Sequence, residues 1–167
     1  SQLIGAHRGS DGQVVFLWTI LRDVSERKAN EAALELERTQ LAQAQAVAHV
    51  GSWTMYPAEK RLIWSDENYR VLGFEPQSVE PSLEAFLAVV HPDDLPAVLA
   101  RLDRDTRSKV SLVSRFEHRI VTPAGLRHVE QRARIEVDAE GHVVRMVGTT
   151  MDITERVLAE QALRENK

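Results

Sequence analysis

The C-terminal part of the chain alternates apolar and polar side chains, which is the pattern of half-buried β-strands. Five runs rich in β-branched and aromatic residues occur along the sequence, at 51–56, 61–64, 110–120, 129–137 and 143–151. Glycine-containing turns at 123–125 and 140–141 separate the last three runs. The pattern therefore predicts two short strands followed by three long antiparallel strands.

Between the second and third runs the apolar spacing becomes helical. Ser65 is placed to cap a short helix over 66–72, and Gly73 to end it. A second helix is predicted at about 82–90. A third carries a one-sided stripe formed by Leu95, Val98, Leu99 and Leu102. We expect an α+β fold in which these helices cover one face of a five-stranded sheet.

Residues 25–49 contain neither glycine nor proline and are rich in good helix formers. Leu34, Leu41 and Ala48 recur every seven positions, with a second apolar stripe beside them. The sequence predicts a helical linker here. It is compatible with a parallel coiled coil and with a single amphipathic helix packed on its own domain.

An internal repeat defines the domain organisation. Residues 11–35 align without a gap on 140–164, with Asp23, Glu26 and Arg27 matching Asp152, Glu155 and Arg156. Only the second copy follows a whole set of strands. The sequence therefore predicts four parts: the C-terminal strands of a truncated preceding domain at 1–24, a helical linker at 25–49, a complete domain at 50–154 and the start of an output helix at 155–167.

The truncated first unit suggests how two chains associate. Its strand, expected over 14–21, lacks most of a sheet, and an unpaired strand edge seeks a partner. We expect 2–8 to serve as its hairpin mate, and a homodimer to form through residues 1–49.

Composition narrows the function classes. The net charge is −4, so no basic face for a nucleic-acid backbone is evident. The longest apolar runs, such as 14–17 and 87–90, are too short to cross a membrane. There is no cysteine, which removes thiolate chemistry and disulfides. We expect a cytoplasmic piece of a longer protein, with no nucleic acid and no membrane segment of its own.

Six short motifs in a fixed order resemble the PAS family with its PAC motif, in the third PAS fold subtype. They are Gly-Ser-Trp at 51–53, Trp-Ser-Asp at 64–66, Leu-Gly-Phe at 72–74, His-Pro-Asp-Asp at 91–94, Phe-Glu-His-Arg at 116–119 and Gly-Thr-Thr-Met-Asp-Ile-Thr-Glu-Arg at 148–156. His128 departs from the family's usual tryptophan, and the turn at 123–125 from its usual Lys-Asp-Gly. The resemblance implies a sensor domain of a bacterial multidomain signalling protein.

The same resemblance suggests what the domain controls and carries. The resemblance implies an effector domain further along the same polypeptide, either the histidine kinase of a two-component system or an enzyme that makes or degrades cyclic-di-GMP. No sequence signature of either effector occurs in this chain. The Asn-Cys-Arg motif of light-sensing relatives is missing, so a covalent flavin adduct is excluded. The cofactor is unknown; haem is not expected, because His91 resembles the family's helix-start motif, and no metal site is expected.

Asp152, Ile153 and Thr154 resemble the family's junction between the sheet and the output helix. We expect Asp152 to pair with Arg156 or with backbone N–H groups, and Thr154 to cap the helix. The first copy of the repeat offers the equivalent junction residues Asp23, Ser25 and Arg27. The alternative is an ordinary helix cap without a signalling role.

Polar side chains on the inward strand face suggest a ligand cavity. His118 and Gln131 interrupt apolar faces, and Thr150 resembles in position a ligand-contacting residue of cofactor-carrying relatives. The candidate cavity residues are His118, Gln131, Thr150, Trp64, Phe116 and Val129. Alternatively, the polar groups bond to one another or to water in a filled core.

Three functions remain in competition. The first is a sensory and dimerisation module that regulates a downstream effector in cis through its flanking helices. The second is a structural spacer that binds no ligand. The third, a small enzyme using His118, needs an inward carboxylate, whereas Glu117, Glu130 and Glu136 alternate outward. No catalytic residue is assigned.

Overall fold

The computed structural model describes residues 10, 12 and 16–166 of the 167-residue chain, with side chains from Ser25 onward in its first helix. The chain divides into two compact units, residues 1–41 and 42–167. Within the described residues, no helix is both long enough and apolar enough to cross a lipid bilayer.

Helix α1, Phe16–Ala48, runs from the first unit into the second. The remaining elements belong to the second unit. They are β1 Val50–Tyr56, a 3-10 turn η1 Pro57–Glu59, β2 Arg61–Trp64, α2 Asp66–Leu72, α3 Leu83–Val89, α4 Leu95–Thr106, β3 Leu112–Thr122, β4 Gly125–Val137, β5 Val143–Asp152 and α5 Thr154–Glu165.

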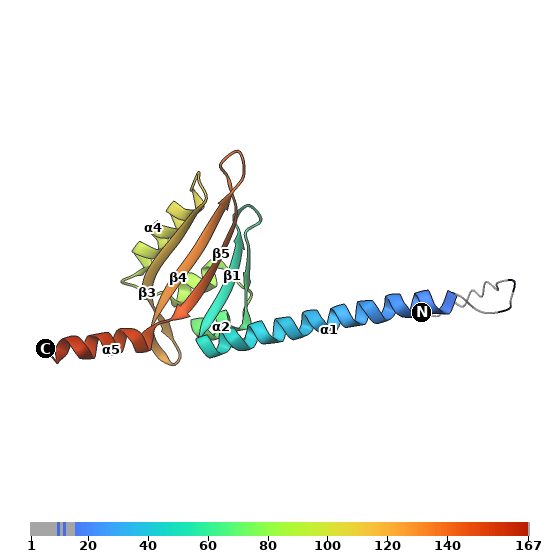
Figure 1. Ribbon diagram of the computed structural model, residues 1–167. Helices are drawn as coiled ribbons and strands as arrows, with labels where there is room; N and C mark the ends of the chain where they lie inside the picture. Colours follow the sequence, from blue (N-terminus) through green and yellow to red (C-terminus); the bar gives the residue numbers. More distant parts are fainter. Residues whose placement is uncertain (1–9, 11, 13–15, 167) are drawn as a thin grey trace. The chain divides into compact units, whose positions relative to one another are not determined.

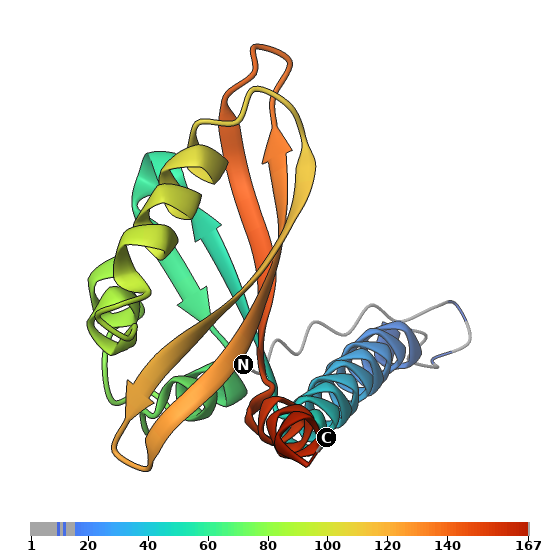
Figure 2. The same cartoon turned by 90° about the vertical axis from the view of Figure 1, so that its left-hand side faces the viewer.

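The five strands form one antiparallel sheet in the order β2-β1-β5-β4-β3. The last strand, β5, therefore lies in the middle, between β1 and β4. Helices α2, α3 and α4 cover one face of this sheet (Figures 1 and 2). The predicted α+β fold, with five antiparallel strands and short helices on one face, is confirmed.

The helix ends follow the residues that were expected to set them. The Ser65 hydroxyl accepts a hydrogen bond from the Asn68 backbone N–H at 3.2 Å, which satisfies one of the unpaired donors of the first turn of α2. Gly73 ends that helix with a φ of 89°, a conformation that costs glycine little. This short helix brings Asn68 to a defined place above the sheet.

The core lies between the helices and the inward face of the sheet. One cluster of buried residues joins Trp64, Tyr69, Val71, Leu72, Ile120 and Val129. A second joins Ala133, Ile135 and Met146, and Trp53 packs against both. Inward residues of the long strands come from alternate positions, as the sequence pattern requires.

The strand expected over 14–21 is wrong where the structure describes it. Residues 16–21 form the first turns of α1 instead. A helix satisfies its backbone N–H and C=O groups internally, whereas a strand needs a neighbour, and no strand pairs with this segment in the described part of the chain. Residues 2–8 lie outside the described residues, and the assignment of 1–24 to a truncated domain remains a prediction.

Helix α1 includes the linker helix expected over 25–49, except for its last residue, His49. In the first unit its apolar side chains Leu34, Leu36 and Leu41 are exposed to solvent. Arg27 forms an ion pair with Glu31 one turn later, at 3.5 Å.

Candidate functional site

The exit from the sheet into α5 is held by two neighbouring polar side chains. One carboxylate oxygen of Asp152, Oδ1, accepts hydrogen bonds from the backbone N–H of Thr154 at 3.0 Å and from its hydroxyl at 2.6 Å. The same hydroxyl accepts a hydrogen bond from the backbone N–H of His128 at 3.0 Å. The end of β5, the beginning of α5 and strand β4 are therefore joined at one point.

The end of α1 is attached to the same point. The backbone N–H of Asp152 donates to the carbonyl of His49 at 3.2 Å. His49 has a φ of 51°, which turns the chain from α1 into β1. One turn before the end of α1, the Gln45 amide donates to the Ser52 hydroxyl at 3.1 Å. The residue that follows α1 is thus hydrogen-bonded to the last residue of β5, two positions before α5 begins.

Arg127 and Glu67 extend the junction to α2. The Arg127 guanidinium donates to the carbonyls of Arg70 and Val71, each at 2.8 Å, and its Nε lies 3.8 Å from the second oxygen of Asp152. Glu67 is buried, and its two carboxylate oxygens lie 3.7 Å from His49 Nδ1 and 3.2 Å from Arg70. An open polar cleft is lined by Ala46, His49, Glu67, Arg70, Val71, Arg127, Asp152, Thr154 and Glu155.

Of the two partners expected for Asp152, the structure shows the backbone one, the N–H of Thr154, and not Arg156. The Arg156 guanidinium lies 2.8 Å from Glu117 and 3.9 Å from Glu130 on the outer face of the sheet. The expectation that Thr154 caps α5 is wrong, because its side chain accepts no hydrogen bond from the first turn of that helix. The arginine that lies beside the Asp152 carboxylate is Arg127 and not Arg156.

The first copy of the repeat does not form this junction. Asp23 and Ser25 lie inside α1, and Arg27 pairs with Glu31 along the same helix. The junction requires neighbouring strands to supply His128 and Arg127, which the first copy lacks in the described part of the chain.

Glu130 points to the outer face, as expected, but it is buried there. Its carboxylate accepts from Arg115 at 2.5 Å and 3.0 Å and from Arg132 at 2.5 Å. Burial by itself would raise the pKa of Glu130, yet the hydrogen bonds from Arg115 and Arg132 outweigh it and hold that pKa below its usual value. The alternating pattern predicts that side chains on this face are exposed to solvent. Glu130 is buried nevertheless, because Arg115 and Arg132 cover its carboxylate.

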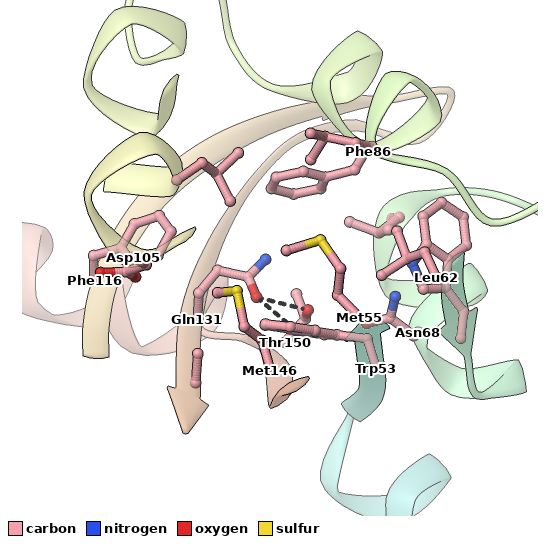
Figure 3. A pocket seen from close by; sticks show the side chains of 15 residues that line it. Trp53, Met55, Leu62, Asn68, Phe86, Asp105, Phe116, Gln131, Met146 and Thr150 are labelled. Carbon is pink, nitrogen blue, oxygen red and sulfur yellow. Dashed lines mark hydrogen bonds between the residues drawn. The ribbon is translucent and has the colours of Figure 1, made fainter. Parts of the chain in front are cut away.

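A cavity lies between the sheet and helices α2, α3 and α4 (Figure 3). Its volume is about 50 Å³, and a single water molecule needs roughly 10–15 Å³. Its lining is mostly apolar and comprises Trp53, Met55, Leu62, Trp64, Asn68, Leu72, Leu83, Phe86, Leu102, Asp105, Phe116, Gln131, Ala133, Met146 and Thr150. As formed, it accommodates a small group and not a flavin or a haem.

Four of the six residues predicted for this cavity line it: Gln131, Thr150, Trp64 and Phe116. Gln131 Oε1 accepts from the Thr150 hydroxyl at 3.0 Å, so these two polar groups also bond to each other. Val129 is fully buried in the core cluster that contains Tyr69 and Ile120, and it does not line the cavity.

His118 is buried but also lies outside the lining. Its ring stacks on Phe116 and meets Phe86 edge to face. Nδ1 lies 3.2 Å from the Arg119 carbonyl, and Nε2 has no partner among the described residues. Burial lowers the pKa of His118, which keeps the ring neutral at neutral pH. His118 therefore packs against Phe86 and Phe116, two residues that line the cavity, without lining it itself.

The sequence analysis did not place Trp53, Asn68 or Asp105 in the cavity. Asp105 supplies the inward carboxylate that was thought to be missing, although Arg104 holds it at 2.8 Å and His118 is not part of the lining. Asp105 lies at the end of α4 among charged neighbours, so no local signal marks it as buried. Asn68 follows a capping serine and carries no signal for its inward position.

A protein-family model described as the PAS fold matches residues 61–150. A methyl sulfide methyltransferase-associated sensor from Methanosarcina acetivorans is 30% identical over 98 residues, which are 58% of this chain and 10% of that protein. A probable diguanylate cyclase from Escherichia coli is 24% identical over 164 residues, 96% of this chain and 14% of that protein. The chain therefore spans a small part of these curated relatives.

Among solved structures, a sensory box histidine kinase/response regulator from Burkholderia thailandensis is similar to the chain. The identity is 29% and the TM-score is 0.61, with 77% of this chain and 94% of that chain covered.

Proposed function

Because the chain belongs to the PAS fold family, we propose that it is a sensory signal-transduction module that regulates an effector domain of the same polypeptide through helix α5. Sensor, diguanylate cyclase and histidine kinase are the descriptions of its relatives. The effector is accordingly a histidine kinase or an enzyme that makes or degrades a cyclic dinucleotide. The module itself transmits a signal and catalyses no reaction.

The observation that carries this proposal is the hydrogen bonding of Asp152. This one residue ends the central strand, accepts the first N–H of α5 and donates to the last residue before β1. A displacement of β5 relative to β1 or β4 therefore changes the position of α5 directly. Thr150, two residues earlier on β5, lines the cavity, so the path from cavity to exit helix is short.

The proposal includes two features of the longer protein. The module works as a homodimer through the helix of residues 25–49, whose exposed leucines recur at coiled-coil spacing. It also resides in the cytoplasm beside its effector, in agreement with a chain without cysteine.

The junction can be tested in a chimeric kinase. Residues 1–167, fused in frame through α5 to the catalytic part of a histidine kinase, should yield an autophosphorylation rate that depends on Thr154. Thr154→Val removes both hydroxyl hydrogen bonds and should change the rate at least threefold, whereas Thr154→Ser should preserve it. Circular dichroism establishes that both variants are folded. Equal rates in both folded variants would refute regulation through this junction.

A further inference from the structure

The orientation of the Gln131 amide is determined by its neighbours. The indole N–H of Trp53 lies 3.1 Å from the Gln131 side chain, and an indole nitrogen can only donate, so the atom facing it is the oxygen Oε1. Thr150 donates to the same oxygen at 3.0 Å. Both lone pairs of Oε1 are therefore occupied, and the side-chain N–H groups point away from this cluster.

These N–H groups face the cavity. Figure 3 shows the Gln131 nitrogen on the side of Met55 and Phe86, and it makes no hydrogen bond with any described residue. Asn68 lies on the opposite wall, is 1% exposed, and its Oδ1 is enclosed without a hydrogen-bond partner among the described residues. A buried polar group without a partner costs roughly 1–3 kcal/mol. Gln131 thus presents unused donors to the cavity.

The lining does not favour a charged molecule. Asp105 is its only ionisable residue, and Arg104 neutralises that carboxylate. Burying a second, unpaired charge among the remaining apolar and amide side chains would be costly. An uncharged oxygen, in contrast, can accept from Gln131 without such a cost.

An apolar groove lies against the outside of the same wall. It is lined by Met55, Pro57, Lys60, Arg61, Leu62, Ser82, Leu83, Leu99, Leu102, Asp103 and Thr106. Met55, Leu62, Leu83 and Leu102 belong to both the groove and the cavity lining. Leu83 and Leu99 are exposed although both are large and apolar. The two spaces therefore lie on either side of the same four side chains.

We propose that cavity and groove form one binding site for an uncharged alkyl molecule with a single carbonyl or hydroxyl oxygen, bound head first through the Leu83 and Leu102 side chains. The oxygen accepts from Gln131, and the alkyl chain extends into the groove. The proposal rests on the sensory function above and specifies its input. It accounts together for the unused donors of Gln131, the lining without an unpaired charge and the exposed leucines.

Binding can be measured by titrating the ¹⁵N-labelled chain with 2-octanone and recording two-dimensional NMR spectra. The Gln131 side-chain signals, identified by their loss in Gln131→Glu, should shift on addition of ketone. Octanoate, which has a charge at the same end, should bind at least tenfold more weakly. Affinity should rise roughly fourfold for each methylene added between 2-butanone and 2-octanone, as expected for burial of the chain in an apolar groove.

Two variants test the head group and the route. Gln131→Glu keeps an oxygen for Trp53 and Thr150 but loses the amide donors, and should weaken 2-octanone binding at least tenfold at neutral pH. Leu102→Trp places a larger side chain between cavity and groove and should weaken 2-octanone binding to a similar extent. Val113→Trp, on the exposed outer face of the sheet, should leave the binding unchanged. Thermal unfolding identifies any variant that is not folded, and Leu83→Trp then replaces Leu102→Trp.

The results separate this inference from the proposed function. Octanoate binding as tightly as 2-octanone, or ketone binding that leaves the Gln131 signals unchanged, would overturn the site. Ketone binding that shifts Gln131 but not the amides of α5 would uphold the site and count against relay through the junction. No binding of any ketone would overturn the site while the Thr154 test of the junction still stands.

Discussion

Asp94 holds β3 against the start of α4 by accepting three hydrogen bonds from Arg119. Its Oδ2 accepts from the Arg119 backbone N–H at 2.7 Å and from Nε at 3.0 Å, and its Oδ1 accepts from the far guanidinium nitrogen at 2.6 Å. The hydrogen bonds from the Arg119 side chain lower the pKa of Asp94 to about 2. Next to it, the His91 backbone N–H donates to the Arg119 carbonyl, so His91 supports the same contact.

Asp94→Asn should therefore lower the free energy of unfolding at pH 7 by about 1–3 kcal/mol. The pKa of Asp94 is lower in the folded than in the unfolded chain, so its contribution is complete above about pH 4 and is lost as the pH falls toward 2. Urea unfolding at several pH values should show wild type and variant converging over this range. Asp93→Asn is the control, because that side chain is 77% exposed; a pH-independent difference would contradict the assignment.

At the scale of elements, α5 is attached to the sheet at two places of unequal strength. The hydrogen bonds of Asp152 and Thr154 hold its first residue, and the ion pair of Arg156 with Glu117 lies on the outer sheet face. Both partners of that ion pair are about half exposed, and exposed pairs contribute between 0 and about 1 kcal/mol. The junction, and not the ion pair, should dominate the position of α5.

Arg156→Gln should accordingly have a small effect. Hydrogen exchange of the first-turn amides of α5 should accelerate by no more than about fivefold, and the difference should shrink at high ionic strength. Mass spectrometry of deuterium uptake checks this, with Arg164→Gln near the exposed end of the helix as control. An increase above tenfold would mean that the outer-face ion pairs hold the helix.

The two copies of the repeat show how far an element can be predicted from its own residues. The second copy forms the expected strand followed by the expected helix, because β1 and β4 pair with its strand. In the first copy residues 16–21 are helical. Strand formation depends on partners elsewhere in the chain, whereas a helix needs only its own backbone.

At the scale of the whole molecule, the exposed leucines of α1 suggest how two chains associate. Leu34 and Leu41 are 49% and 60% exposed and lie seven positions apart in the first unit. A two-stranded parallel coiled coil would bury them against the same residues of a second copy. If the position of helix α5 regulates the effector within a dimer, the two chains must be held together, and this contact between two α1 helices would hold them.

The double variant Leu34→Glu, Leu41→Glu should convert a dimer into a monomer, because it places like charges in the seam. Sedimentation equilibrium of the full chain measures this, and Thr39→Glu adds a charge on the side of the helix opposite the seam as control. The fragment 42–167, which is a compact unit by itself, should also be monomeric. A wild-type chain that sediments as a monomer, or a variant that remains dimeric, would contradict the coiled coil.

From residue 50 onward, the sequence alone determined the helices and strands, their order and the face that each strand turns inward, because apolar periodicity and capping residues act over a few neighbouring positions. Only the tertiary structure decided which polar atoms meet: Arg127 rather than Arg156 beside Asp152, three arginines around Glu130, and Trp53 with Thr150 on one oxygen of Gln131. These partners lie far apart in the chain and are brought together by strand register. Which atoms of the cavity remain without partners is therefore a property of the folded sheet and not of any local pattern.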